Sequence, residues 1–151
     1  MKIKIVVVGN LKEKYFVDAV AEYKKRLSKF CDLEIIELAE KNHLQTPQQI
    51  LNQEAKDILK HLAGFVVVMD IQGKMLDSVE LSKKIESIQM TNSTITFVIG
   101  SSYGLSDEVK GKATMRLSMS PMTFPHQLAR VMLVEQLYRC FCISNNITYH
   151  K

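Results

Sequence analysis

The sequence predicts an α/β fold: a mostly parallel sheet of about five strands with helices on both faces. Short apolar segments of strand length alternate along the chain with segments whose apolar residues recur at helical spacing. Residues 65–69 are apolar throughout, as expected of a strand covered on both faces. Residues 94–99 lead into Gly100 and a turn bounded by a second glycine, which is how α/β proteins open a ligand crevice at the carboxyl end of the sheet.

The predicted strands are residues 2–8, 32–38, 65–69, 94–99 and 113–118. The first helix is indicated by apolar residues at helical spacing, which are Phe16, Val20, Tyr23, Leu27 and Phe30. A second helix begins after Thr46, where Pro47 and Gln49 complete a capping box, and ends near Gly64. Residues 70–73 are predicted to form a turn.

A third helix runs from Asp77 or Ser78 through Gln89, and a short fourth helix opens at Ser106. A long final helix follows Pro125, which suits a first helical turn because its missing N–H costs nothing there. Its apolar residues cover more than one stripe, so the helix must be covered on more than one side.

Composition and length predict one globular domain, residues 1–151. Hydrophobic residues make up 46% of the 151 and charged residues 24%. Apolar runs are far shorter than the ~20 residues of a membrane span, and the apolar start of the chain is typical of a first strand rather than a signal peptide. We therefore expect a cytoplasmic protein without membrane contacts. The net charge of +4 permits an RNA partner but does not require one.

No familiar metal or nucleotide motif is present. Cys140 and Cys142 lie two positions apart on a helix and point in different directions, so we expect reduced, buried thiols and no metal site. Residues 100–104 do not form a dinucleotide fingerprint, and residues 73–75 do not form a P-loop.

The histidines and methionines carry weak signals by themselves. His43 and His61 are expected at the surface, and His126 either satisfies local backbone groups or belongs to a site. His150 is second from the C-terminus, where chain ends are usually frayed. We expect four methionines to serve in packing rather than in cofactor binding: Met115, Met119, Met122 and Met132.

Four segments nevertheless carry a resemblance that spans essentially the whole chain. They are MDIQGK (69–74), FVIGSSYGLS (97–106), LSMSPMTFPHQLARVMLVEQLYR (117–139) and the terminal TYHK (148–151). Together they resemble the small bacterial SPOUT-class methyltransferases that methylate N3 of a pseudouridine in large-subunit (23S) ribosomal RNA. The third segment is long and the most specific.

The resemblance implies a C-terminal trefoil knot, a homodimer, and S-adenosylmethionine (SAM) bent in the knot as the methyl donor. By position, its contacts fall on Met69, Gly100, Met119, Ser120, Pro121, Met122, Thr123 and Phe124. It also implies that His150 acts as base and Tyr149 stacks on or hydrogen-bonds the target base, both reaching across to the partner's cofactor. Arg130 either contacts phosphate or base, or pairs with an acidic neighbour; Asp70 either orients the ribose or caps a turn.

Two positions depart from the family pattern. Ser101 stands where the family usually has a second glycine, and it would be strained if the loop needs a positive φ. Thr148 stands where the family has proline, which makes the tail more mobile. Because the domain offers few phosphate contacts, we expect it to recognise a large preformed surface such as the ribosome. The alternatives are a transfer-RNA methyltransferase of the same knotted class and a non-catalytic nucleotide-binding or protein-interaction module.

Overall fold

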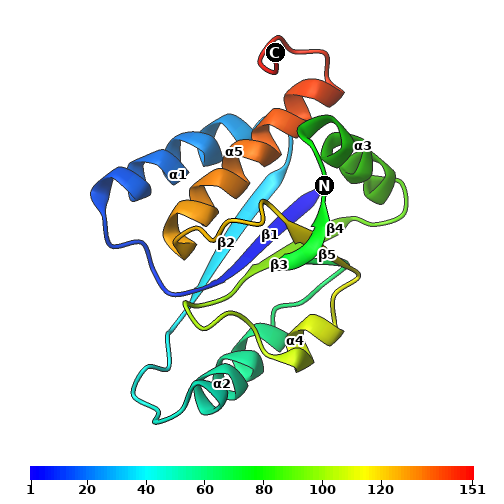
Figure 1. Ribbon diagram of the computed structural model, residues 1–151. Coiled ribbons are helices and arrows are strands. Elements are labelled where there is room, and N and C mark those ends of the chain that lie inside the picture. The colour runs from blue at the N-terminus through cyan, green and yellow to red at the C-terminus, as the bar shows by residue number, and fades with distance from the viewer.

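The computed structural model describes all 151 residues as five strands and five helices in alternating order (Figure 1). The strands are β1 (Lys2–Val8), β2 (Asp32–Leu38), β3 (Phe65–Met75), β4 (Thr94–Ile99) and β5 (Met115–Ser118). The helices are α1 (Lys14–Leu27), α2 (Pro47–Leu59), α3 (Ser78–Gln89), α4 (Asp107–Gly111) and α5 (His126–Ser144). All neighbouring strands are parallel and their order is β2-β1-β4-β3-β5, which confirms the predicted α/β class.

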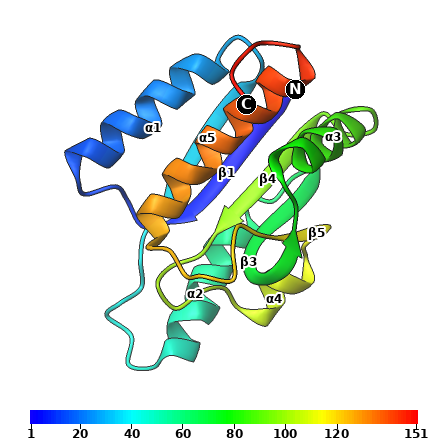
Figure 2. The same cartoon turned by 45° about the horizontal axis from the view of Figure 1, so that its top comes forward.

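Helices cover both faces of this sheet. α1, α3 and α5 lie on one face, and α2 and α4 lie on the other (Figures 1 and 2). The side chains of β1 alternate between the two cores: Ile3, Ile5 and Val7 face the first, while Val6 and Val8 face the second. Strands covered on both faces read as continuous apolar runs, which explains the composition of β1, β3 and β4.

Helix starts follow the local sequence closely. Thr46 and Asp77 each form a capping box, with Gln49 and Glu80 respectively, and Ser106 caps α4. The end of α2 differs from the prediction, because the helix stops at Leu59 rather than near Gly64.

The early end of α2 has a tertiary cause on β4. The hydroxyl of Thr96 donates to the carbonyl of Ala63 at 2.7 Å and accepts from its N–H at 3.2 Å. These bonds satisfy the backbone of Ala63 outside the helix.

Residues 70–73 are not the isolated turn that the sequence predicts, because β3 extends through them to Met75. β5 pairs with β3 twice: Leu117 is opposite Met69 and, after an irregularity, opposite Lys74. At Gly73 the two backbones approach so closely that a Cβ would lie 2.7 Å from the carbonyl carbon of Arg116.

The trefoil knot stays a prediction, and the structure shows the path of the chain after β5. This segment leaves the edge of the sheet, passes the connection between β3 and α3, and enters α5 on the face covered by α1 and α3 (Figure 2). Leu117 and Met119 share a cavity with Leu76 and Asp77 of that connection. α5 then packs against both α1 and α3, so it is covered on more than one side as predicted.

The cysteines match their prediction, and a separate finding concerns the helices. The three cysteines are free and buried. None of the five helices combines the length and the apolar character that crossing a bilayer would take.

Candidate functional site

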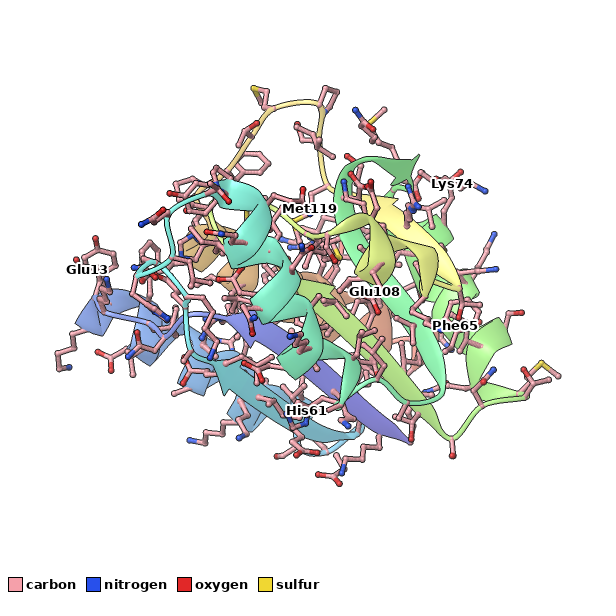
Figure 3. The ribbon with its side chains drawn as sticks, turned by 90° about the horizontal axis from the view of Figure 1, so that it is seen from below. Glu13, His61, Phe65, Lys74, Glu108 and Met119 are labelled. Atoms are coloured by element: carbon pink, nitrogen blue, oxygen red, sulfur yellow. The ribbon has the colours of Figure 1, made fainter.

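A cavity of about 640 Å³ opens at the carboxyl ends of β3, β4 and β5. Its wall comes from residues 69–71, from the loop after β4, and from the segment that joins β5 to α5. Figure 3 shows Met119 and Lys74 toward this side of the molecule and His61 and Phe65 toward the opposite, amino-terminal side of the strands. The crevice expected at the carboxyl edge of the sheet is therefore present.

Seven of the eight residues predicted to contact a cofactor lie in the cavity wall. These are Met69, Gly100, Met119, Ser120, Met122, Thr123 and Phe124. Pro121 belongs to the same loop but not to the wall, and it is exposed. The fold brings the three predicted segments together, and their part in binding stays a prediction.

The loop after β4 is tightly closed. The N–H of Gly104 donates to the carbonyl of Ser101 at 2.9 Å, and Gly104 has a φ of +85°. A Cβ at Gly100 would lie 2.2 Å from the carbonyl oxygen of Gly104, so only glycine fits at Gly100.

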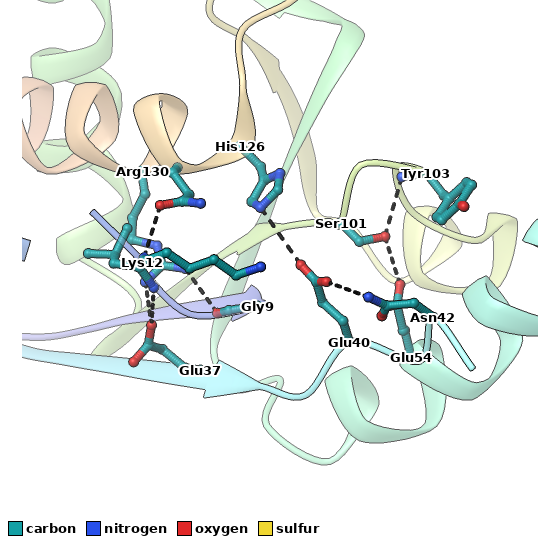
Figure 4. Close-up of polar contacts among 12 residues, drawn as sticks. Gly9, Lys12, Glu37, Glu40, Asn42, Glu54, Ser101, Tyr103, His126 and Arg130 are labelled. Carbon is teal, nitrogen blue, oxygen red and sulfur yellow. Dashed lines mark hydrogen bonds and ion pairs between the residues drawn. The ribbon is translucent and has the colours of Figure 1, made fainter. Parts of the chain in front are cut away.

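Ser101 is not strained, which corrects the concern raised by its departure from the family pattern. Asn146 is the only non-glycine residue with a positive φ, so serine is compatible with the backbone at Ser101. Its buried hydroxyl donates to the carboxylate of Glu54 at 2.8 Å (Figure 4).

Asp70 serves the turn and also borders the cavity. Its Oδ1 accepts from the N–H of Gln72 at 3.0 Å, which is the turn-capping alternative. Its buried Oδ2 has no hydrogen-bond partner and lies 3.8 Å from both Lys110 Nζ and Arg116 Nη1. Lys110 also lines the cavity, so a paired carboxylate and ammonium stand at its wall.

His126 lies in the first turn of α5 and lines the cavity. Its Nε2 is 3.8 Å from Glu40 Oε1 (Figure 4). Of the two alternatives for His126, the structure therefore places the ring at the site.

Arg130 pairs with an acidic residue, which is one of the two alternatives that the sequence allowed. Its Nη1 donates to Glu37 Oε2 at 2.7 Å and its Nη2 to the carbonyl of Gly9 at 3.0 Å (Figure 4). The side chain is only 2% exposed. The contacts are structural ones, and a direct role for Arg130 in chemistry stays a prediction.

The C-terminal tail folds back onto α5. The Tyr149 hydroxyl donates to Glu135 Oε1 at 3.0 Å, and the guanidinium of Arg139 lies over the Tyr149 ring and donates to the same carboxylate. His150 Nδ1 is 3.3 Å from Arg139 Nη1. Burial, together with hydrogen bonds to Tyr23 and Glu135, raises the pKa of Tyr149, so its hydroxyl stays protonated.

The tail and the cavity lie at opposite ends of α5. Glu135 and Arg139 are nine and thirteen residues beyond His126, which corresponds to roughly 14–20 Å at 1.5 Å per residue. Tyr149 and His150 are therefore not part of this chain's cavity.

Comparison with known proteins decides the family. A family model described as a predicted SPOUT methyltransferase matches residues 1–150. The chain belongs to the SPOUT methyltransferase family. Its relatives include a putative ribosomal RNA large subunit methyltransferase H from Methanococcus vannielii, 49% identical, and ribosomal RNA large subunit methyltransferase H from Clostridium botulinum, 48% identical; each match covers 100% of both chains.

Solved structures share the fold of this SPOUT methyltransferase at low identity. A probable methylase family protein from Haemophilus influenzae gives a TM-score of 0.57 at 16% identity, covering 99% of this chain and 70% of that one. A putative methyltransferase from Legionella pneumophila, solved with bound SAM, gives 0.54 at 13% identity, covering 91% and 65%.

Sequence reasoning missed three charged residues of this methyltransferase that organise the site and the tail: Glu54, Glu135 and Arg139. A signal for Glu54 exists, since it shares one helical stripe with the buried Ile50 and Ile58. Glu135 and Arg139 stand four residues apart in an otherwise apolar helix, which is the spacing of an ion pair.

Proposed function

We propose that this SPOUT methyltransferase is a cytoplasmic enzyme that transfers the methyl group of SAM to N3 of a pseudouridine in 23S ribosomal RNA. The observation that carries the proposal is full-length identity of 46–49% to proteins named ribosomal RNA large subunit methyltransferase H. Because these matches cover 100% of both chains, they favour the ribosomal substrate over the transfer-RNA alternative.

The cavity suits SAM as its ligand. A volume of about 640 Å³ lies within the range of roughly 300–1,000 Å³ typical of small-molecule sites. The wall combines apolar side chains, such as Met69, Ile99 and Leu117, with residues of the Gly100 and Ser120 loops. The bound donor supplies a methyl group that is already activated, so the protein has to position the base and remove one proton.

A homodimer would bring the tail to a cavity. If two copies pack with their α5 helices antiparallel, the C-terminal end of one helix lies beside the N-terminal end of the other. A second cavity of about 470 Å³ beside α5, bordered by the half-buried Leu76, Val131 and Met132, supports an apolar contact here. Each tail would then meet the partner's SAM.

In this arrangement, His150 accepts the N3 proton of the pseudouridine and Tyr149 holds the base. Arg139 can only donate, so its contact requires His150 Nδ1 to be the accepting nitrogen in the free protein. Nδ1 must therefore exchange Arg139 for the substrate when it acts as base. Glu135 keeps Tyr149 and Arg139 together during this exchange.

The substrate is a large preformed surface, the assembled ribosome. With a net charge of +4, one subunit can neutralise few phosphates. Dimerisation doubles this surface, including the basic end of α1 with Lys24, Lys25 and Arg26. We expect weak binding to naked RNA fragments.

Calorimetric titration tests the cofactor assignment directly. We expect the protein to bind SAM and to bind flavin and adenine nucleotides much more weakly. Gly100→Ala should abolish SAM binding, because its Cβ would lie 2.2 Å from the carbonyl oxygen of Gly104. Gly111→Ala is the matched control, since nothing lies within 4 Å of a Cβ there. Preference for a flavin, or SAM binding that survives Gly100→Ala unchanged, would contradict the proposal.

A further inference from the structure

Glu54 is a buried carboxylate without a cationic partner. Its residue is 2% exposed and lies on α2 in the stripe that packs against the second core. The nearby ammonium of Lys41 contacts Asp57 instead, at 3.3 Å. Burying a charge costs free energy unless hydrogen bonds compensate it. The groups that hydrogen-bond the Glu54 carboxylate therefore indicate its role.

Those partners are few, and one belongs to the cavity wall. Glu54 Oε1 accepts from the Ser101 hydroxyl at 2.8 Å, and Oε2 accepts from the N–H of Lys41 at 3.3 Å. A hydroxyl has one hydrogen, and that of Ser101 is committed to Glu54. The Ser101 oxygen therefore presents its lone pairs to the N–H of Tyr103, 3.4 Å away (Figure 4).

This chain of contacts spans the loop that borders the cavity. Ser101 carries the Glu54 bond on its side chain and the closing bond from Gly104 on its carbonyl. Ser101 thus links α2 to the start of the loop, where it lies itself, and to the end of the loop at Gly104. A hydrogen bond to a charged group is stronger than one between neutral groups, so the carboxylate fixes the loop more firmly than an amide would.

We propose that Glu54 is a positioning residue for cofactor binding: through Ser101 it holds loop 100–104 in the shape that SAM requires. The inference rests on the proposed function, in which SAM occupies this cavity.

The test is a double-mutant cycle on SAM affinity with Ser101→Ala, Glu54→Gln and the double variant. Ser101→Ala should raise the dissociation constant about tenfold, because hydrogen bonds to charged groups are worth on the order of that factor. Glu54→Gln should raise it less, since an amide oxygen still accepts from the hydroxyl. The double variant should bind no more weakly than Ser101→Ala, because one contact cannot be lost twice.

Asn52→Ala is the control, since Asn52 lies on the same helix, is exposed, and accepts a hydrogen bond from Gln48 rather than from a residue of the loop. It should leave SAM binding unchanged. In turnover assays, Ser101→Ala and Glu54→Gln should raise KM for SAM while kcat stays within about twofold, a split that a general loss of stability does not produce.

Three results would overturn the inference: unchanged SAM affinity in Ser101→Ala, unchanged affinity in Glu54→Gln, or losses that multiply in the double variant. Failure of the proposed function looks different. In that case the unmodified protein itself does not bind SAM, whatever its residues 54 and 101.

Discussion

At the scale of single residues, several side chains that resemble catalytic candidates are engaged in holding the structure. Arg130 illustrates this best, because a buried guanidinium from α5 reaches Glu37 on β2 and the carbonyl of Gly9 after β1. It joins the last helix to the first two strands beside the cavity. Its Nε has no hydrogen-bond partner, so the two Nη hydrogen bonds alone offset the cost of removing the guanidinium from water.

Arg130→Met should lower the free energy of unfolding by about 2 kcal/mol, because it removes charge-assisted bonds and leaves the Gly9 carbonyl without its donor. Urea denaturation measures this. Glu37→Gln should cost less, since the Glu37 side chain is 43% exposed and water can replace the arginine. Full stability with complete loss of methyl transfer in Arg130→Met would instead indicate direct participation in the reaction.

At the scale of elements, the end of α5 determines where the tail goes. Asn146 adopts a left-handed backbone with φ of 54°, and the N–H of Ile147 donates to the carbonyl of Cys142 at 2.9 Å. This is the Schellman ending, in which a residue with positive φ reverses the chain. The reversal brings Tyr149 against Tyr138, with ring centroids 4.8 Å apart.

Asn146→Ala should destabilise this ending by about 1 kcal/mol, because alanine enters the left-handed region at that cost. We expect slower methyl transfer with unchanged SAM affinity, since the tail loses its anchor while the cavity keeps its shape. Asn146→Gly is the control and should retain activity. Equal rates for the alanine and glycine variants would show that the turn does not position the tail.

At the scale of the whole molecule, the tail and the cavity are separated along α5, and under the proposed mechanism a single subunit would lack a complete site. Roughly 14–20 Å of helix lies between them, so the proposed chemistry needs a second copy. The proposal thus ties activity to association, and dilution below the dimer's dissociation constant should abolish activity per subunit.

Mixed dimers test this arrangement. Gly100→Ala disrupts the cavity of its own subunit and keeps the tail intact. His150→Ala removes the base from the tail and keeps the cavity intact. Each variant alone should be inactive. Mixed after unfolding and refolding together, they should recover about one quarter of wild-type activity, because half of the dimers are mixed and each holds one intact site. No recovery would contradict a site shared between subunits.

The parts of the structure that sequence predicted are those fixed by local patterns. The capping box at Thr46, the helix start at Asp77 and the apolar strands β1 and β4 lie where expected, because neighbouring residues determine them. The extension of β3 beyond Met69 was missed, since it depends on pairing with Leu117 of β5. The same holds for the Glu54–Ser101 contact, which joins residues 47 positions apart.

The cavity was predicted in outline because three motifs end at the same edge of the sheet, and resemblance supplied the ligand. Arg130 could not be resolved from sequence, as its partner lies 93 positions away on another element. The place of the tail was equally out of reach, because it depends on Glu135 and Arg139 acting together on Tyr149.

Methyl transfer to large-subunit ribosomal RNA can be measured with three substrates side by side. Labelled methyl groups from SAM are offered to ribosomes lacking the modification, to isolated large subunits and to bulk transfer RNA. We expect label at N3 of one pseudouridine in 23S ribosomal RNA, with whole ribosomes as the best substrate and transfer RNA unlabelled. Label on transfer RNA, or no transfer to any of the three by protein that binds SAM, would contradict the proposed function.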